Sequence, residues 1–349
     1  MKTLFTLVLC GWLAGALMTF SPAPAFAQSL QLTVISDEGS SAHIFPTEQT
    51  ATALRAQNAE RVATLAGVLA YHGGPVVTTA TSYAIFWIPS TGKLQNGKPT
   101  SMTPHYQTVL TNFLKDYPGH SIANNNTQYY QGSTTKTYIN NAGTFGGSYI
   151  DTSSYPTSGC TDSATPGNCL SDAQIHSEIA KVMAIKGWTG GNSKIFFLFT
   201  SSGEGSCFNS TNCAYVQYCA YHSFFSSGGL NVIYGNEPFG TTNGCAGNPS
   251  PNNDPPADSA ATALEHELTE AITDPLLNAW FDGTTGAEIG DLCNQYMGYL
   301  GYDGGKANEF WNGHFYAVQT EYSNYLSNTF MVVNGVNGPT GCFNVGPEL

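Results

Sequence analysis

Residues 171–200 read SDAQIHSEIAKVMAIKGWTGGNSKIFFLFT, and they place a helix directly before a strand. Ser171 followed three residues later by Gln174 is the pattern of a capping box, which predicts a helix from Ser171 to about Trp188. The run Lys194–Thr200 is aromatic and apolar, so it predicts a buried strand. A helix followed by a buried strand indicates an α/β or α+β fold.

The same alternation continues on both sides of this stretch. Ser82–Pro89 (SYAIFWIP) and Leu230–Tyr234 (LNVIY) predict two more buried strands, and Thr103–Asp116 predicts an amphipathic helix. A further helix is expected over about Ser259–Thr273, and it must end before Pro275. We therefore expect a central mixed sheet with a buried helix.

The first residues have the features of a secretory signal peptide. Lys2 supplies the positive charge, residues 4–20 are almost entirely apolar, and Ala25-Phe26-Ala27 matches a cleavage site. The sequence thus predicts a signal peptide over residues 1–27 and a secreted chain with no membrane anchor once the signal is removed.

Composition limits the classes of partner. The 349 residues include 11 Lys+Arg and 24 Asp+Glu, for a formal net charge of −13, which argues against nucleic acid and anionic membranes. Hydrophobic residues make up 41%, enough for a sizeable core and against wholesale disorder. We expect residues 28–70 to be an N-terminal region or a pro-segment, and residues 71–349 to be a single domain.

Eight cysteines follow the predicted signal peptide, and an even number in an oxidising compartment favours disulfides. Sequence alone leaves the pairing open. Because short spacings would staple loops, the expected pairs are Cys160–Cys169, Cys207–Cys213, Cys219–Cys245 and Cys293–Cys342. No C-x-x-C is present, which argues against a cysteine zinc site.

The residues that point to chemistry lie on the late helix, in the run His266-Glu267-Leu268-Thr269-Glu270. Positions i and i+4 share one face of a helix, so His266 and Glu270 can bind a single ion. The run is close to H-E-x-x-H, in which two histidines bind zinc and the glutamate is the general base. Glu270 replaces the second histidine, so calcium becomes a competitor of zinc. The run therefore predicts a buried metal-site-like helix in a disulfide-stapled, metallopeptidase-like architecture.

A third ligand is required, and Glu288, 18 residues downstream of Glu270, is the preferred candidate. The alternatives are Asp291, Asp274, His222 and His314. In this hypothesis His266, Glu270 and Glu288 hold zinc, which lowers the pKa of a water. Glu267 would take the proton before attack on a carbonyl. The alternative is that the helix glutamates are solvated and His266 is a core histidine.

Four blocks in series resemble the phosphate-induced protein 1 / EXORDIUM family. They are residues 71–76 (YHGGPV), 218–223 (YCAYHS), 266–275 (HELTEAITDP) and 288–293 (EIGDLC). The family consists of secreted proteins, best known from plant cell walls, with bacterial relatives. The resemblance implies an extracellular or cell-wall-associated protein whose residues 71–349 form an EXORDIUM-like domain, and it implies no settled activity. It also places His222 in a matching block, as a transition-state donor, a metal ligand or part of a disulfide-rich loop.

Two functions are therefore expected. The first is a secreted zinc-dependent, peptidase-like hydrolase that acts on a peptide or cell-wall component, with Glu267 and His222 as catalytic residues. Its candidate metal ligands are His266, Glu270, Glu288 and Asp291. The second is a non-catalytic extracellular or cell-wall-associated protein in which these residues hold a structural ion or no metal.

Overall fold

The structure is a computed structural model that describes most of the chain. The described residues are 32–36, 39–62, 69–240, 244–245, 249–329, 332–333, 336–337 and 339–343. The predicted signal peptide lies outside these ranges. Within them, none of the helices combines the length and the apolar character of a membrane span.

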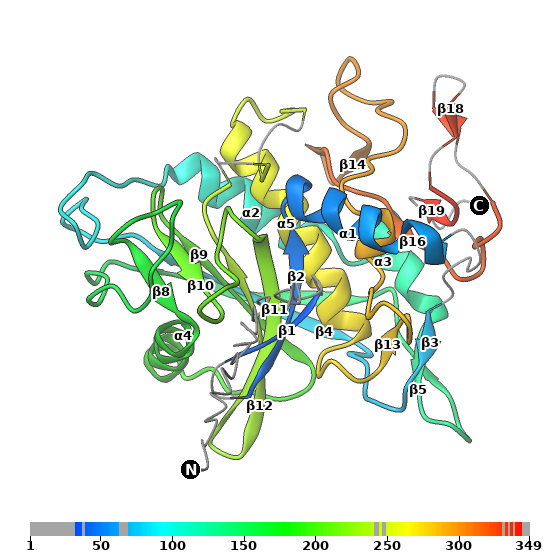
Figure 1. The fold of residues 1–349 in the computed structure, drawn as a ribbon, viewed down its shortest axis with the longest axis horizontal. Helices are drawn as coiled ribbons and strands as arrows, with labels where there is room; N and C mark the ends of the chain where they lie inside the picture. Colours follow the sequence, from blue (N-terminus) through cyan, green and yellow to red (C-terminus); the bar gives the residue numbers. More distant parts are fainter. Residues whose placement is uncertain are drawn as a thin grey trace, which may run out of the picture.

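A seven-stranded mixed sheet lies at the centre of the molecule (Figure 1). From edge to edge it consists of β1 (Thr33–Ile35), β2 (Ser41–Pro46), β11 (Tyr218–Ser227), β12 (Leu230–Glu237), β9 (Lys194–Thr200), β4 (Ala80–Trp87) and β7 (Gly143–Asp151). β12, β9, β4 and β7 are mutually parallel, whereas β1, β2 and β11 pair antiparallel with their neighbours. The expected α/β class with a central mixed sheet is confirmed.

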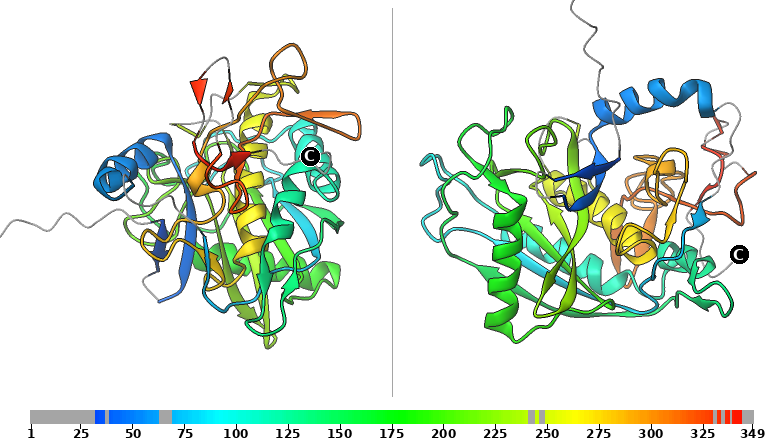
Figure 2. Two further views of the ribbon diagram at one scale, coloured as in Figure 1. Left: turned by 90° about the vertical axis from the view of Figure 1, so that its right-hand side faces the viewer. Right: turned by 60° about the horizontal axis from the view of Figure 1, so that its bottom comes forward.

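Two hydrophobic cores cover the two faces of this sheet. Ile195, Phe197 and Phe199 of β9 pack with α2 (Pro104–Asp116) and α5 (Pro255–Thr273). The alternate residues Phe196 and Leu198 pack with α4 (Asp172–Lys186) on the opposite face. Figure 2 shows α4 (green) and α5 (yellow) on opposite sides of the sheet. The unbroken apolar run of β9 is thus explained by burial on both faces, each large side chain contributing about 1.5–3 kcal/mol.

The predicted helices form with small changes at their ends. The capping box of α4 is present: Ser171 Oγ accepts from the Gln174 N–H, and Gln174 Oε1 accepts from the Ser171 N–H. α5 starts at Pro255 instead of about Ser259, because the Asp254 side chain caps it by accepting from the Ala257 N–H at 3.3 Å. The Pro- and Asn-rich composition of residues 245–258 is typical of a loop, yet proline fits the first turn of a helix.

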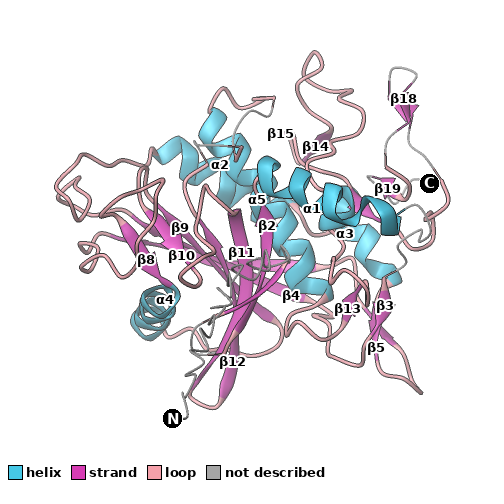
Figure 3. Ribbon diagram, in the orientation of Figure 1, coloured by secondary structure: helices cyan, strands magenta, loops and turns pink. Residues whose placement is uncertain are grey.

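Shorter elements surround this framework, and long loops connect them (Figure 3). The helices are α1 (Glu48–Val62) and α3 (Ser121–Asn125), with 3-10 turns η1 (Asn126–Gln128) and η2 (Asp291–Cys293). The strand pairs are β3 (Ala70–Tyr71) with β13 (Trp280–Phe281), β5 (Tyr130–Gln131) with β6 (Thr137–Tyr138), β8 (Cys169–Ser171) with β10 (Gly205–Cys207), β14 (Glu309–Trp311) with β15 (His314–Tyr316), β16 (Glu321–Tyr322) with β19 (Cys342–Phe343), and β17 (Val332–Val333) with β18 (Val336–Asn337). Trp311, Tyr316, Tyr322 and Cys342, from β14, β15, β16 and β19, belong to the same hydrophobic core as α5, and α5 is buried from Ala257 to Thr273.

Part of the N-terminal region is integral to the sheet. β2 lies between β1 and β11, and His43 of β2 is paired with His222 of β11. The Thr47 N–H donates to the carbonyl of Gln217, which extends this pairing beyond β2. Removal of residues 28–70 would therefore leave one edge of β11 without its partner.

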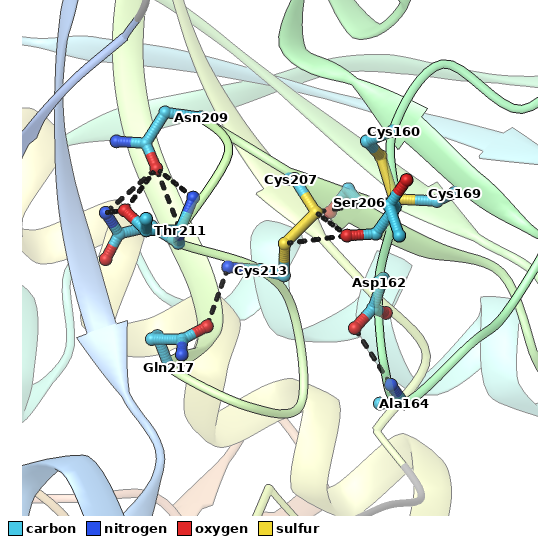
Figure 4. The surroundings of a disulfide bond; sticks show 12 residues. Cys160, Asp162, Ala164, Cys169, Ser206, Cys207, Asn209, Thr211, Cys213 and Gln217 are labelled. Atoms are coloured by element: carbon cyan, nitrogen blue, oxygen red, sulfur yellow. Dashed lines mark hydrogen bonds between the residues drawn. A yellow bond between two sulfur atoms is a disulfide. The ribbon is translucent and has the colours of Figure 1, made fainter.

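All four expected disulfides are confirmed, with Cα–Cα separations between 4.0 and 5.6 Å. Cys160–Cys169 and Cys207–Cys213 lie side by side where β8 pairs with β10 (Figure 4). The sulfurs of Cys169 and Cys207 are 3.4 Å apart. Since these cysteines are paired, they hold no thiolate with which to bind a metal.

Candidate metal centre

Strand alternation brings two histidines to the face of the sheet that carries α5. On β2, Ala42 and Ile44 point into the core beside α4, so His43 and Phe45 point toward α5. The pairing of His43 with His222 places the two imidazole rings side by side, with centroids 5.9 Å apart. The strand register therefore brings His43 and His222 into contact although they are far apart in the sequence.

Helix α5 supplies three further side chains. His266 and Glu270 converge as the i, i+4 spacing predicts, with Nε2 and Oε1 3.1 Å apart. Glu267 Oε2 lies 3.1 Å from His222 Nδ1, and its Oε1 accepts the Phe45 N–H at 3.1 Å. The other oxygen of Glu270, Oε2, lies 3.6 Å from His222 Nδ1.

The segment around η2 completes the arrangement. Glu288 Oε1 is 3.1 Å from His43 Nδ1, and Glu288 Oε2 is 3.8 Å from His222 Nε2. Asp291 Oδ2 is 2.5 Å from His43 Nε2, and Asp291 Oδ1 is 3.8 Å from His266 Nε2. Gly290 allows this close approach, since a Cβ there would lie 2.6 Å from His266 Nδ1.

These contacts define one group of side chains, which we call the His/carboxylate cluster. Its members are His43, His222, His266, Glu267, Glu270, Glu288 and Asp291. Each of these side chains is at most 2% exposed. In the described part of the chain, none of them pairs with a lysine or arginine.

Several buried polar atoms of the cluster have no hydrogen-bond partner. They are His222 Nε2, both ring nitrogens of His266, both oxygens of Glu270, Glu288 Oε2 and Asp291 Oδ1. A buried unsatisfied polar group costs about 1–3 kcal/mol, and a charged group costs more. A divalent cation fits such a site, because it can bind unpartnered imidazole nitrogen and carboxylate oxygen atoms and it neutralises the carboxylates.

The electrostatics of the cluster follow from burial and mutual contact. Burial alone would lower the pKa of His43, but Asp291 and Glu270 outweigh it and raise this pKa to about 9. Burial, helped by the charge of His43, lowers the pKa of His222 to about 3. Burial raises the pKa of Glu267 to about 8 and that of Glu270 well above its usual value. The cluster thus retains protons when no cation is present, and metal binding would release them.

The six residues that the sequence proposed as catalytic groups or metal ligands all lie in this cluster. Two of the alternative third ligands have other partners. His314 lies on β15, with Nδ1 2.7 Å from Asp116 Oδ2. Asp274 follows the end of α5, and its Oδ1 accepts the N–H groups of Asn278 and Ala279 at 2.6 Å. Its Oδ2 is buried without a hydrogen-bond partner, and its charge helps to raise the pKa of Glu288, so Asp274 lies beside the cluster.

Sequence reasoning missed His43. This residue lies in the region 28–70, which contributed nothing to the resemblance or to the metal motif. The signal that it offered was the run SAHIFP at residues 41–46, a strand-like apolar pattern with one histidine in it.

A cavity of about 680 Å³ adjoins the cluster. Its walls come from the end of β2, from α1 and from the segment around η2, and they include Leu54, Leu292 and Tyr296. Asp291 belongs both to the cavity wall and to the cluster. Glu48 is the other acidic residue of the wall, so an approaching ligand meets apolar surface and negative charge.

Fold and site together define a disulfide-stapled α/β protein with a buried histidine and carboxylate cluster. The chain is 41% identical over 57 residues to Protein EXORDIUM-like 5 of Arabidopsis thaliana. That match covers 16% of this chain and 16% of the plant protein, so the chain matches well under two thirds of its relative's length. No protein-family model and no solved structure matches the chain. The similarity supports the EXORDIUM-like resemblance over a short stretch.

Proposed function

We propose that this chain is a secreted, zinc-dependent hydrolase of peptidase-like type that belongs with the EXORDIUM-like proteins. The observation that carries the proposal is the cluster itself: three histidines and four carboxylates from four separate segments, buried together with unpartnered lone pairs. Burying these groups without a cation would cost free energy, so a purely structural, hydrogen-bonded core explains the cluster poorly.

The donor types favour zinc over calcium. Calcium binds oxygen ligands in proteins, whereas imidazole nitrogen suits zinc and other first-row transition ions. Three of the seven side chains are histidines, and His266 and Glu270 already stand 3.1 Å apart on one helix face. The proposed metal is therefore zinc, with His266 and Glu270 as its first two ligands.

When bound, zinc would supply Lewis acidity and lower the pKa of a water. Of the chain's own residues, Glu267 and His222 touch at 3.1 Å, so they can share and pass on a proton. Asp291 connects the cluster to the neighbouring cavity, which is the proposed route for a carbonyl substrate. The wall of this cavity is apolar and acidic, so it favours a peptide with apolar or basic side chains. A cell-wall component is the alternative substrate.

A second candidate function is a non-catalytic extracellular protein with a structural ion. Two observations favour it: the cluster is almost completely buried, and both oxygens of Glu267 are engaged by protein groups. Structural zinc sites are closed in this way, whereas catalytic ones keep one position open.

The test combines metal content with peptide cleavage. Protein secreted by its host is purified without chelator, and zinc is measured by mass spectrometry in wild type, His266→Ala and Glu204→Gln. Glu204 is buried outside the cluster, so its variant is the matched control. We expect zinc in wild type and control, loss in His266→Ala, and chelator-sensitive cleavage of a peptide library. Zinc without cleavage would favour the structural ion, and absence of zinc would refute the proposal.

A further inference from the structure

We propose that the cluster holds two divalent cations bridged by Glu270. This inference rests on the proposed metal-dependent function and deepens it by assigning the second ion to residues that the H-E-x-x-E pattern does not include.

Two sets of ligand atoms carry the proposal. One set comes from His43, Glu270 and Asp291, and the other from His222, Glu267 and Glu270; within each set all atoms lie within 4.8 Å of one another. Glu270 is common to both sets. Its Oε1 faces His266 at 3.1 Å and its Oε2 faces His222 at 3.6 Å, so each oxygen is directed at a different histidine. A carboxylate placed in this way can bridge two ions about 3.5–4 Å apart.

The remaining two residues fit the same arrangement. His266 Nε2 lies near the first set, 3.8 Å from Asp291 Oδ1. Glu288 spans both sets, since its two oxygens lie 3.1 Å from His43 and 3.8 Å from His222. Every member of the cluster is thereby assigned to at least one ion.

The number of donors agrees with two ions. A four-coordinate zinc uses four ligands, so a single ion would leave three of the seven side chains unbound to metal. Two such ions need eight ligand positions, and seven residues with Glu270 shared supply eight. The first ion would take His43, His266, Asp291 and Glu270, and the second would take His222, Glu267, Glu288 and Glu270.

The charges agree as well. The four carboxylates of the cluster carry four negative charges, and three neutral histidines add none. One divalent cation would leave two negative charges buried with no lysine or arginine beside them, whereas two cations balance the cluster. In this arrangement Glu267 and His222 are ligands of the second ion. The proton-handling role proposed above for these two residues therefore applies to the chain with only the first ion bound.

The test is metal stoichiometry of the full secreted chain. Chelator-treated protein is reloaded with zinc, dialysed and analysed by mass spectrometry. We expect two zinc ions per chain in wild type, about one in His43→Ala, about one in His222→Ala, and two in the control His314→Ala, whose histidine pairs with Asp116 outside the cluster. Circular dichroism checks that each variant is folded.

A second readout needs no variant. Wild type is loaded with one and then two equivalents of manganese(II), and electron paramagnetic resonance is recorded. A spin-coupled signal at two equivalents is expected for ions that share Glu270. One ion per chain, or two ions without coupling, would overturn the bridged pair. If wild type binds a single zinc ion and His266→Ala loses it, the bridged pair is overturned but the proposed zinc-dependent function stands. If wild type binds no metal, the bridged pair and the proposed function are both overturned.

Discussion

Gly290 offers a sharp test of the geometry of the cluster. A Cβ at this position would lie 2.6, 2.8 and 3.0 Å from three atoms of the His266 ring. The backbone of Gly290 has φ −74° and ψ −38°, a conformation that alanine adopts without strain. The whole effect of Gly290→Ala must therefore come from the contact with His266.

The magnitude follows from overpacking. Inserting one carbon into a tightly packed core costs about 1–3 kcal/mol. Alanine also lowers the conformational entropy of the unfolded chain, which offsets about 0.4–1 kcal/mol of this loss in stability. The His266 ring cannot move away easily, since it is fully buried and Phe45 packs against it with ring centroids 4.4 Å apart. We expect a net loss of about 1–2 kcal/mol in the free energy of unfolding, and a weaker affinity for zinc because His266 is displaced.

The assay is urea unfolding of metal-free protein, followed by competition for zinc against a coloured chelator. Gly283→Ala is the matched control: its Cβ would also meet a histidine, but at 3.3 Å and against His72, which is exposed and not buried. Equal stability and equal zinc affinity in Gly290→Ala and wild type would show that residue 290 does not approach His266 as the structure has it.

Three further predictions concern other parts of the chain. Burial raises the pKa of Glu204 to about 8, and Gln95 donates to this carboxyl at 2.6 Å. The pKa of a glutamate in the unfolded chain is about 4.3. Because the pKa of Glu204 is higher in the folded chain, its contribution to stability is fully present below about pH 4.3 and is lost as pH rises through about 8. Relative to wild type, the free energy of unfolding of Glu204→Gln in urea should therefore increase by a few kcal/mol between pH 5 and pH 9. A difference between the two proteins that does not change with pH would contradict the raised pKa of Glu204. A chain secreted without residues 28–70 should bind less zinc than the full chain in the same elemental analysis, because His43 is lost; unchanged zinc content would exclude His43 as a ligand. Cys342→Ser opens the disulfide that ties β19 to η2, and it should cost about 2–5 kcal/mol in denaturant unfolding, whereas an effect below about 1 kcal/mol would contradict a structural role.

Local patterns were enough to predict much of the framework. The capping box at Ser171 and the apolar run of Lys194–Thr200 predicted α4 and β9, because both signals are contained within a few residues. The same holds for the pair His266 and Glu270, since helix geometry alone places side chains four residues apart on one face. The four disulfides were also predicted, although their spacing left other pairings open.

The start of α5 shows where a local pattern misled. The Pro- and Asn-rich residues before Ser259 have loop composition, yet Asp254 caps a helix that begins at Pro255. Composition alone cannot tell whether such residues form the first turn of a helix, because the deciding hydrogen bond depends on the direction of the capping side chain.

The H-E-x-x-E run was sufficient to suggest a metal-site helix, and its residues were named before any fold was known. The partners of that helix depended on the tertiary structure. His43 enters the cluster because β2 pairs with β11 in a register that sets it opposite His222. Glu288 reaches both rings because the segment that precedes η2 approaches α5, where Gly290 lies against His266. Helix periodicity is a property of neighbouring residues and can be read along the chain. Strand register joins segments that are far apart in sequence, and it is set by which faces of the sheet become buried when the whole chain folds.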